Sequence, residues 1–200
     1  MKKILSSILL SALLVAGCLK TQSIERRYNV NSIRSVAGWK GAAMHHFHVG
    51  SFQVHGYVLT NPTGSVRGGK FTIPIVSIKN FDLPADEKEQ LMSHLKTADF
   101  FNMALHPNAT FWITRIDDYY GQAGDAIANK LVTGDFSMAG QTHMIQFPAK
   151  IDYIADSLKL HAEFKINRAK WGMTKYTDPA AADYILPEAD ITLKVEAGIK

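Results

Sequence analysis

The chain has 200 residues, of which 46% are hydrophobic and 20% are charged, the composition of an ordinary globular protein. This length fits one domain or at most two small ones, and the apolar content excludes a disordered or collagen-like chain. The single cysteine excludes an intramolecular disulfide and any metal or iron–sulfur site held by several thiolates. The formal net charge of +4 at pH 7 raises the question of nucleic-acid binding.

The first 17 residues have the pattern of a secretory signal peptide. Lys2 and Lys3 form a short basic region, and residues 4–16 are apolar or small apart from serines. A helix that spans a bilayer needs roughly 20 apolar residues, so this segment is too short for a permanent membrane helix. We therefore expect residues 1–17 to be removed on export.

The sequence VAGC at residues 15–18 resembles the lipobox of bacterial lipoproteins. That resemblance implies a mature protein that begins with Cys18, carrying a diacylglyceryl group and usually a third, N-linked fatty acyl chain of the palmitate type. Two or more acyl chains hold a protein stably at a membrane. Because Leu19 follows the cysteine where aspartate would favour the inner membrane, we expect an outer-membrane anchor facing the periplasm. The alternative is an ordinary secretory peptide with an incidental cysteine.

Loss of the signal peptide also changes the charge balance of the chain. Without Lys2 and Lys3, 20 basic residues face 18 acidic ones, so the net charge falls to +2. A nearly neutral exported protein has little electrostatic reason to bind nucleic acid, and we expect none. Residues 18–27 are predicted to be the lipidated cysteine and a polar tether, and residues 28–200 one domain large enough for a real core.

The dominant hydrophobic period in that domain is two, which is typical of strands with one buried face. Only residues 84–96 look helical, with a proline near the start and acids in the first turn. Many strands and one short helix predict a mainly β fold, either an antiparallel barrel or a sandwich. The predicted strands cover residues 71–75, 145–151, 158–166 and 191–197, and more weakly 35–40, 44–60, 108–117 and 129–138.

Six phenylalanines occupy the inward faces of these strands. A barrel of about eight strands either fills its interior with side chains or holds one small ligand. On spacing alone, a packed core is the simpler interpretation. The six are Phe52, Phe71, Phe111, Phe136, Phe147 and Phe164.

A series of short motifs extends over essentially the whole predicted domain. They are SI at 77–78, LMSHL at 91–95, ADFFN at 98–102, HP at 106–107, TF at 110–111, VTGDFSMAG at 132–140, FKINR at 164–168 and WG at 171–172. In this order the motifs resemble the YceI family of bacterial polyisoprenoid-binding, lipocalin-like proteins. Two departures, Leu91–Ser93 in place of an arginine and aspartate and His106 in place of a common tyrosine, concern the head-group environment more than the fold.

The resemblance implies a single antiparallel, lipocalin-like β-barrel with one short helix. Its interior would hold a long isoprenoid or alkyl lipid, with no cofactor required. Each buried CH₂ group contributes about 0.8 kcal/mol, so a long chain can bind tightly with few polar contacts. Our candidate ligand-binding residues are Trp39, Phe52, Phe71, Ile73, Phe111, Ile113, Phe136, Met138, Phe147, Phe164 and Ile166.

A histidine-rich segment supports an alternative, a metal-binding envelope protein. In MHHFH at residues 44–48, His46 and His48 share one strand face, a spacing that can chelate zinc, copper or nickel. His45 would point to the opposite face, so three ligands from this segment would require a bulge. A polar outer face or a hydrogen-bonded histidine explains the pattern equally simply. For His94 and His106 we expect structural hydrogen bonds rather than catalysis.

Motifs typical of enzymes do not occur in the sequence. There is no G-x-S-x-G or H-E-x-x-H motif, and GSVRGGK at residues 64–70 lacks the Ser or Thr of a phosphate-binding loop. Residues 171–188 break the strand pattern and could cover one mouth of a barrel. We therefore expect a non-catalytic carrier, store or sensor of an apolar lipid. The sequence does not decide whether the protein forms a homodimer. A filled barrel acting only as an interaction partner is the third class considered.

Overall fold

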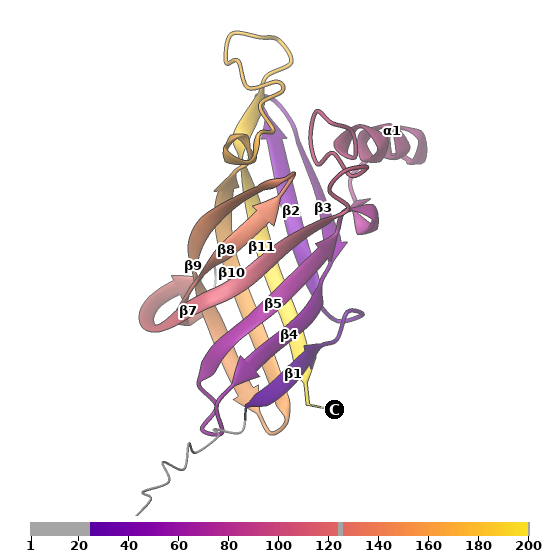
Figure 1. Cartoon of the computed structure of the whole chain (residues 1–200). Helices are drawn as coiled ribbons and strands as arrows, with labels where there is room; N and C mark the ends of the chain where they lie inside the picture. Colours follow the sequence, from indigo (N-terminus) through magenta and orange to yellow (C-terminus); the bar gives the residue numbers. More distant parts are fainter. Residues whose placement is uncertain (1–24, 124–125, 200) are drawn as a thin grey trace, which may run out of the picture.

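The computed structural model describes residues 25–123 and 126–199 and shows one antiparallel β-barrel with a single α-helix (Figure 1). The predicted fold class is confirmed. The helix α1 is Ala85–Leu95, and two short 3-10 helices are η1 (Ile75–Ser77) and η2 (Arg168–Trp171). The strands are β1 (Arg26–Val30), β2 (Val36–Ala43), β3 (Phe47–Gln53), β4 (His55–Thr60), β5 (Val66–Pro74), β6 (Lys79–Asn80), β7 (Asn108–Ala123), β8 (Ala126–Met138), β9 (Gln141–Ile154), β10 (Ser157–Asn167) and β11 (Ile185–Gly198).

The sheet closes on itself because β1 pairs with both β4 and β11. Strands β1 and β2 pair with successive parts of β11, while β3 pairs with β2 and β4 pairs with β1. In the barrel wall, β1 and β2 together occupy the position of one strand, and so do β3 and β4. Together with β5 and β7–β11 they make an eight-stranded closed barrel.

Several strand boundaries differ from the sequence prediction. The predicted tether is too long at its C-terminal end, because Arg26 and Arg27 already pair in β1. The sequence RRYNV has no apolar alternation to reveal this strand. The predicted strand 44–60 is a turn followed by two strands, β3 and β4, and Gly56 adopts a φ of +130° at the bend. A Cβ on Gly56 would lie 1.9 Å from the carbonyl oxygen of Lys70, so this close approach requires glycine.

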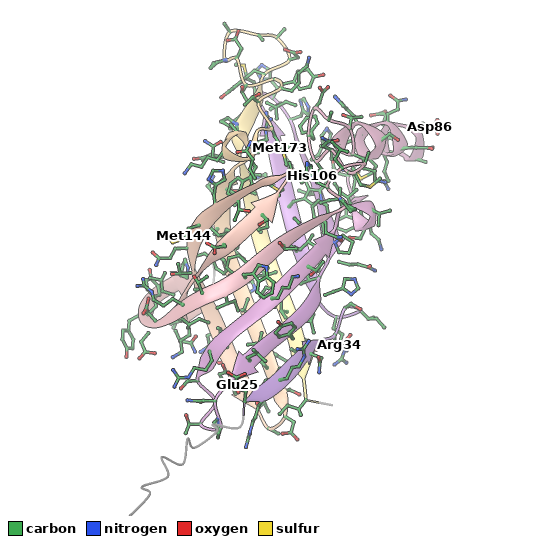
Figure 2. All side chains as sticks on the ribbon, in the orientation of Figure 1. Glu25, Arg34, Asp86, His106, Met144 and Met173 are labelled. Atoms are coloured by element: carbon green, nitrogen blue, oxygen red, sulfur yellow. The ribbon has the colours of Figure 1, made fainter. Side chains whose placement is uncertain are left out.

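The two ends of the barrel are built differently. The α1 end carries the helix, the β2–β3 and β8–β9 turns and the loop 172–184, whereas the β1 end carries both the start of β1 and the end of β11 (Figure 1). In Figure 2, Met173 and His106 lie toward the α1 end, and Glu25 and Arg34 lie toward the β1 end. The predicted irregular segment 171–188 is shorter than expected, since β11 starts at Ile185.

The half of the barrel nearest the β1 end is a packed core. Its inward side chains are mainly valine, leucine, isoleucine and alanine, and they form one hydrophobic cluster of buried residues. These residues are at most 7% exposed. They include Tyr28, Val54, Val58, Ile113, Val132, Ala149, Ile151, Leu158, Leu160, Ala162, Val195 and Ala197.

The wall changes at the α1 end, where one strand pairing is replaced by an inserted segment. Strand β5 pairs with β4 as far as His55 and Thr72, but β3 pairs with the short β6 instead of continuing this ladder. Residues 75–107, which include η1, β6 and α1, connect β5 to β7 in the chain and lie at this end. The barrel wall here is therefore partly made of side chains from an irregular segment.

Candidate functional site

A cavity of about 250 Å³ occupies the half of the barrel nearest the α1 end. Its wall is overwhelmingly apolar. Side chains from β2, β3, β5 and β7–β11 line it together with side chains from the inserted segment 75–107, among them Ile75, Ile78, Leu91, Leu95, Phe100 and Phe101. Small-molecule sites have volumes of roughly 300–1,000 Å³, so this cavity is just below that range.

A layer of phenylalanines separates the cavity from the packed half. On each of six successive wall positions, the cavity-lining residue nearest the β1 end is a phenylalanine. The next inward residue is a buried apolar side chain on four of these positions, and on β5 and β8 it is a buried glycine, Gly69 and Gly134. On β7, for example, Phe111 lines the cavity, whereas Ile113, the next inward residue, does not. The phenylalanine layer consists of Phe52, Phe71, Phe111, Phe136, Phe147 and Phe164.

Aromatic contacts run through this layer across four strands. The ring centroids of Phe147 and Phe164 are 4.2 Å apart in a stacked arrangement, and Phe111 lies 5.5 Å from Phe147 and 6.4 Å from Phe71. Such pairs add about 0.5–1.5 kcal/mol each beyond the burial of their area. The layer is thus a rigid floor for the cavity.

The structure brings ten of the eleven candidate residues together around this one cavity. Ile113 is the exception. It packs in the core beneath the layer, with its Cδ1 atom 3.1 Å from the position of a Cβ on Gly69, and it fills the space that this glycine leaves. Ile113 is therefore removed from the candidate lining. The alternation along β7 predicts that its side chain points inward, but not how far along the barrel axis it lies. Ligand contact for the other ten remains a prediction.

Sequence reasoning missed the lining residues of the inserted segment. Leu91 and Leu95 lie on α1, and Phe100 and Phe101 follow it in an irregular turn, so no strand period marked them as inward. The only available signal was their position in the family-like motifs LMSHL and ADFFN. The polar lining residues Arg168 and Glu188 were missed for a related reason, since a charged residue near the end of a strand ordinarily faces solvent.

Two histidine–aspartate pairs lie at the α1 end. Nδ1 of His48 is 2.7 Å from the Oδ2 atom of Asp82, and the backbone N–H of Val49 and the Asn80 amide also donate to Asp82. Desolvation alone would raise the pKa of Asp82, but these hydrogen bonds and the nearby His48 outweigh it and lower the pKa. Nε2 of His94 is 3.3 Å from Asp99.

His94 and His106 both make structural contacts, but only the His94 side chain forms one of the expected hydrogen bonds within the described residues, with Asp99. The ring of His94 makes edge contacts with Phe100 and Tyr176, at centroid distances of 5.2 and 5.8 Å. The ring of His106 packs against Gly140, where a Cβ would lie 2.8 Å from its Nε2 atom. Both histidines therefore connect the inserted segment to other parts of the α1 end.

The histidine segment does not complete a metal site within the described residues. His46 and His48 both line the cavity, and their rings are 5.2 Å apart. Within residues 25–123 and 126–199, however, no three His, Cys, Asp or Glu side chains are grouped as metal ligands would be. Two histidines are too few for a site made by the protein alone.

Two buried polar groups at the cavity stand out. Trp39 lines it, and its indole Nε1 is buried without a hydrogen-bond acceptor among the described residues. Arg168 is only 7% exposed, and its guanidinium donates to the carbonyl oxygens of Lys175 and Ile185 at 3.0 and 3.1 Å. Burial lowers the pKa of Arg168, although an arginine remains cationic at neutral pH.

Together these features define the class of protein: an antiparallel, lipocalin-like barrel with one packed half and one hollow, apolar half. The family model of the YceI-like domain matches residues 28–197, and the chain belongs to this family. A comparison with curated protein sequences finds no match. In the described part of the chain, no helix combines the length and apolar character needed to cross a membrane.

Solved structures share the fold at low sequence identity. BcnA of Burkholderia cenocepacia is 16% identical with a TM-score of 0.69, over 84% of this chain and 99% of that one. A polyisoprenoid-binding domain from Saccharophagus degradans is 12% identical with a TM-score of 0.62, over 86% and 98% of the two chains. The YceI protein of Campylobacter jejuni is 20% identical with a TM-score of 0.54, over 74% and 81%.

Proposed function

We propose that this protein binds one long apolar chain, of the isoprenoid or alkyl class, in the cavity and does not transform it. The observation that carries the proposal is the hollow half itself, because ten predicted lining residues surround one apolar space above the phenylalanine layer. The similar domain from Saccharophagus degradans is described as polyisoprenoid-binding, which supports the same ligand class here.

The energetics of burial favour such a ligand. An apolar wall offers few hydrogen bonds, so affinity must come from the area of ligand removed from water, at about 25 cal/mol per Å². A chain of methylene or isoprene units presents that area with little polar surface to desolvate. A protein that carries, stores or senses lipid in an aqueous compartment needs this kind of enclosure.

The proposal is tested by the molecules that the protein retains on purification. The full chain, purified and extracted with organic solvent, should release one apolar molecule per chain, identified by mass spectrometry. Ile166→Asn places an amide in the cavity wall and should lower this yield at least severalfold. Lys159→Asn, on the outward face of the same strand, is the control and should leave the yield unchanged. A wild-type protein that releases no stoichiometric apolar molecule contradicts the proposal.

We further propose that the barrel works in the bacterial envelope, anchored through acyl chains on Cys18 to the outer membrane. The support is the VAGC sequence after an apolar segment of signal-peptide length. Arg26, where the barrel wall starts, is eight residues beyond Cys18. Eight extended residues span at most about 28 Å, so the β1 end would lie close to the anchoring membrane.

Metabolic labelling tests the anchor. Cells fed an alkyne analogue of palmitate should incorporate the label into the wild-type chain, and Cys18→Ser should abolish incorporation. The matched control is Ser23→Ala, which changes a hydroxyl in the predicted tether and should leave labelling intact. Equal labelling of wild type and Cys18→Ser, or a Cys18→Ser variant that still fractionates with membranes, contradicts the anchor.

A further inference from the structure

Among the described residues, the cavity wall contains one buried arginine without an acidic partner. This residue, Arg168, is the first residue of η2, directly after β10, and is only 7% exposed. Its guanidinium carbon is 5.6 Å from the ring centroid of Phe100, and it donates to carbonyl groups of Met173 and Ile185. All three of these residues line the cavity, so the guanidinium belongs to its wall.

The hydrogen bonds of Arg168 go to neutral carbonyl oxygens only. Nη1 donates to Met173 and Lys175, Nη2 donates to Ile185, and Nε makes a longer contact of 3.5 Å with Leu186. A guanidinium has five N–H donors, so one Nη2 hydrogen has no acceptor among the described residues. Among those residues, no carboxylate forms an ion pair with Arg168.

Three other ionisable side chains of the described lining have a partner of opposite charge, whereas His46, like Arg168, forms no ion pair with a described residue. His48 and His94 face Asp82 and Asp99. Glu188, the acidic residue of the described lining, has Lys165 at 3.8 Å. A buried charge is costly unless an opposite charge compensates it, and carbonyl dipoles compensate only in part.

We propose that the bound lipid has an acidic head group, a carboxylate or a phosphate, that pairs with Arg168 while the chain extends toward the phenylalanine layer. The inference rests on the proposed lipid-binding function and narrows its ligand class. Carboxylates and phosphates both match the fork of donors on a guanidinium. The acceptor oxygen would take the remaining Nη2 hydrogen and supply the missing countercharge.

Three ligands with the same chain and different head groups test this proposal. Dodecanoate, dodecyl phosphate and dodecan-1-ol would compete with the neutral fluorescent probe N-phenyl-1-naphthylamine for the delipidated full chain. One charge-assisted hydrogen bond in a buried site should make the anionic ligands about tenfold tighter than the alcohol. The ratio between the carboxylate and the phosphate tells which of the two acids the site prefers.

Variants of Arg168 separate its charge from its structural contacts. Arg168→Gln should bring the anionic ligands down to the affinity of the alcohol, with the affinity for the alcohol unchanged. Arg168→Lys keeps the charge and should keep most of the preference. Lys170→Gln removes an exposed cation from the same short helix, and this control should behave as wild type.

The outcomes distinguish this proposal from the proposed function. Equal binding of acid and alcohol by wild type overturns the acidic head group and leaves lipid binding standing. An Arg168→Gln protein that still prefers the acids also overturns it. Failure of all three ligands to displace the probe overturns both proposals. If Arg168→Gln does not fold, the ratio of acid to alcohol affinity in the wild type and in Arg168→Lys still tests the acidic head group.

Discussion

The two halves of the barrel have the same strands but opposite interiors. Toward the β1 end, inward residues such as Val132, Ala149 and Ala162 are fully buried in the core. Toward the α1 end, the same strands surround a cavity of about 250 Å³. The phenylalanine layer lies between these two environments.

This difference indicates that the barrel divides stability from ligand binding. Close packing in one half supplies burial and dispersion energy without any ligand. The other half forgoes that energy, because β3 pairs with β6 instead of continuing the β4–β5 ladder and the inserted segment leaves the interior open. A substitution should therefore affect either the free energy of unfolding or the ligand, according to its side of the layer.

The largest effect should come from truncating a side chain in the packed half. Leu158 and Ile166 both point inward on β10, but Leu158 is 1% exposed in the packed core whereas Ile166 lines the cavity. Leu158→Ala should lower the free energy of unfolding by about 2–5 kcal/mol. Ile166→Ala should cost less than half as much, because its side chain already borders empty space. Urea denaturation of the delipidated proteins measures both, and equal losses would remove the distinction between the halves.

The reverse substitution, from a small to a large side chain, should lower the stability when it is made in the packed half but not when it is made in the hollow half. Ala149→Leu overpacks the filled half and should destabilise the protein by about 1–3 kcal/mol. Ala109→Leu projects into the cavity and should leave the stability of the empty barrel unchanged or higher, while reducing the amount of bound lipid. Thermal unfolding and lipid extraction of this pair provide the measurement. A strongly destabilised Ala109→Leu would mean that the cavity has no free volume.

At the β1 end, the stability measured as a function of alkaline pH should report on the packed half. Burial, and secondarily Tyr28, raises the pKa of Tyr153 to about 12 from the usual 10. The unfolded chain thus loses this proton at lower pH than the folded one. The stability that this tyrosine contributes is complete below pH 10 and is lost as the pH rises through about 12. Tyr153→Phe should flatten the alkaline limb of the stability curve, and an unchanged limb would contradict this assignment.

At the α1 end, the corresponding effect of pH on the stability occurs at acidic pH and is smaller. Because its hydrogen bonds lower the pKa of Asp82 below 3.8, the stability that this carboxylate contributes is present above that value and is lost as the pH falls below it. Asp82→Asn should reduce the acid sensitivity of unfolding near pH 3–4 and leave the alkaline limb as it is. A stability profile identical to that of wild type would show that the His48–Asp82 pair contributes nothing.

The smallest effect should come from a surface pair near the β1 end. Arg34 and Glu196 form an ion pair at 3.2 Å, but the side chain of Arg34 is 69% exposed. Such pairs contribute about 0–1 kcal/mol. Arg34→Gln should change the free energy of unfolding by less than about 0.5 kcal/mol, measured in urea at low and high salt. A larger loss would show that the packed half depends on charge as well as on packing.

The resemblance to the YceI family predicted a hollow barrel, and ten of the residues that line its cavity were predicted. The alternating hydrophobic pattern predicted a mainly β fold and the buried face of each strand. It placed Phe71, Phe111 and Phe164 on inward faces, but it did not say whether a residue lies above or below the boundary of the cavity. Ile113 was misassigned for that reason. Periodicity reports the face of a strand, whereas depth depends on register and tilt across the whole barrel.

Some of the lining residues that were missed lie on predicted strands, such as Ile145, Ile191 and Leu193, and others come from places without a strand period. Phe100 and Phe101 line the cavity only because residues 75–107 replace a strand pairing, and no local pattern encodes that replacement. Arg168 is buried because the carbonyl groups of the following loop and of β11 surround its guanidinium. Both features are tertiary, so they require the closed barrel before they exist.

The central claim, that an apolar chain occupies the hollow half, is tested most directly by the three tryptophans. Trp39 lines the cavity, whereas Trp112 lies on the outer face of β7 and is 46% exposed. Two variants would each keep one of these as the sole fluorophore, with Phe at the other and at Trp171. A bromine-labelled fatty acid should quench Trp39 at one ligand per chain and leave Trp112 unquenched. Equal quenching of both, or none at Trp39, would contradict the account.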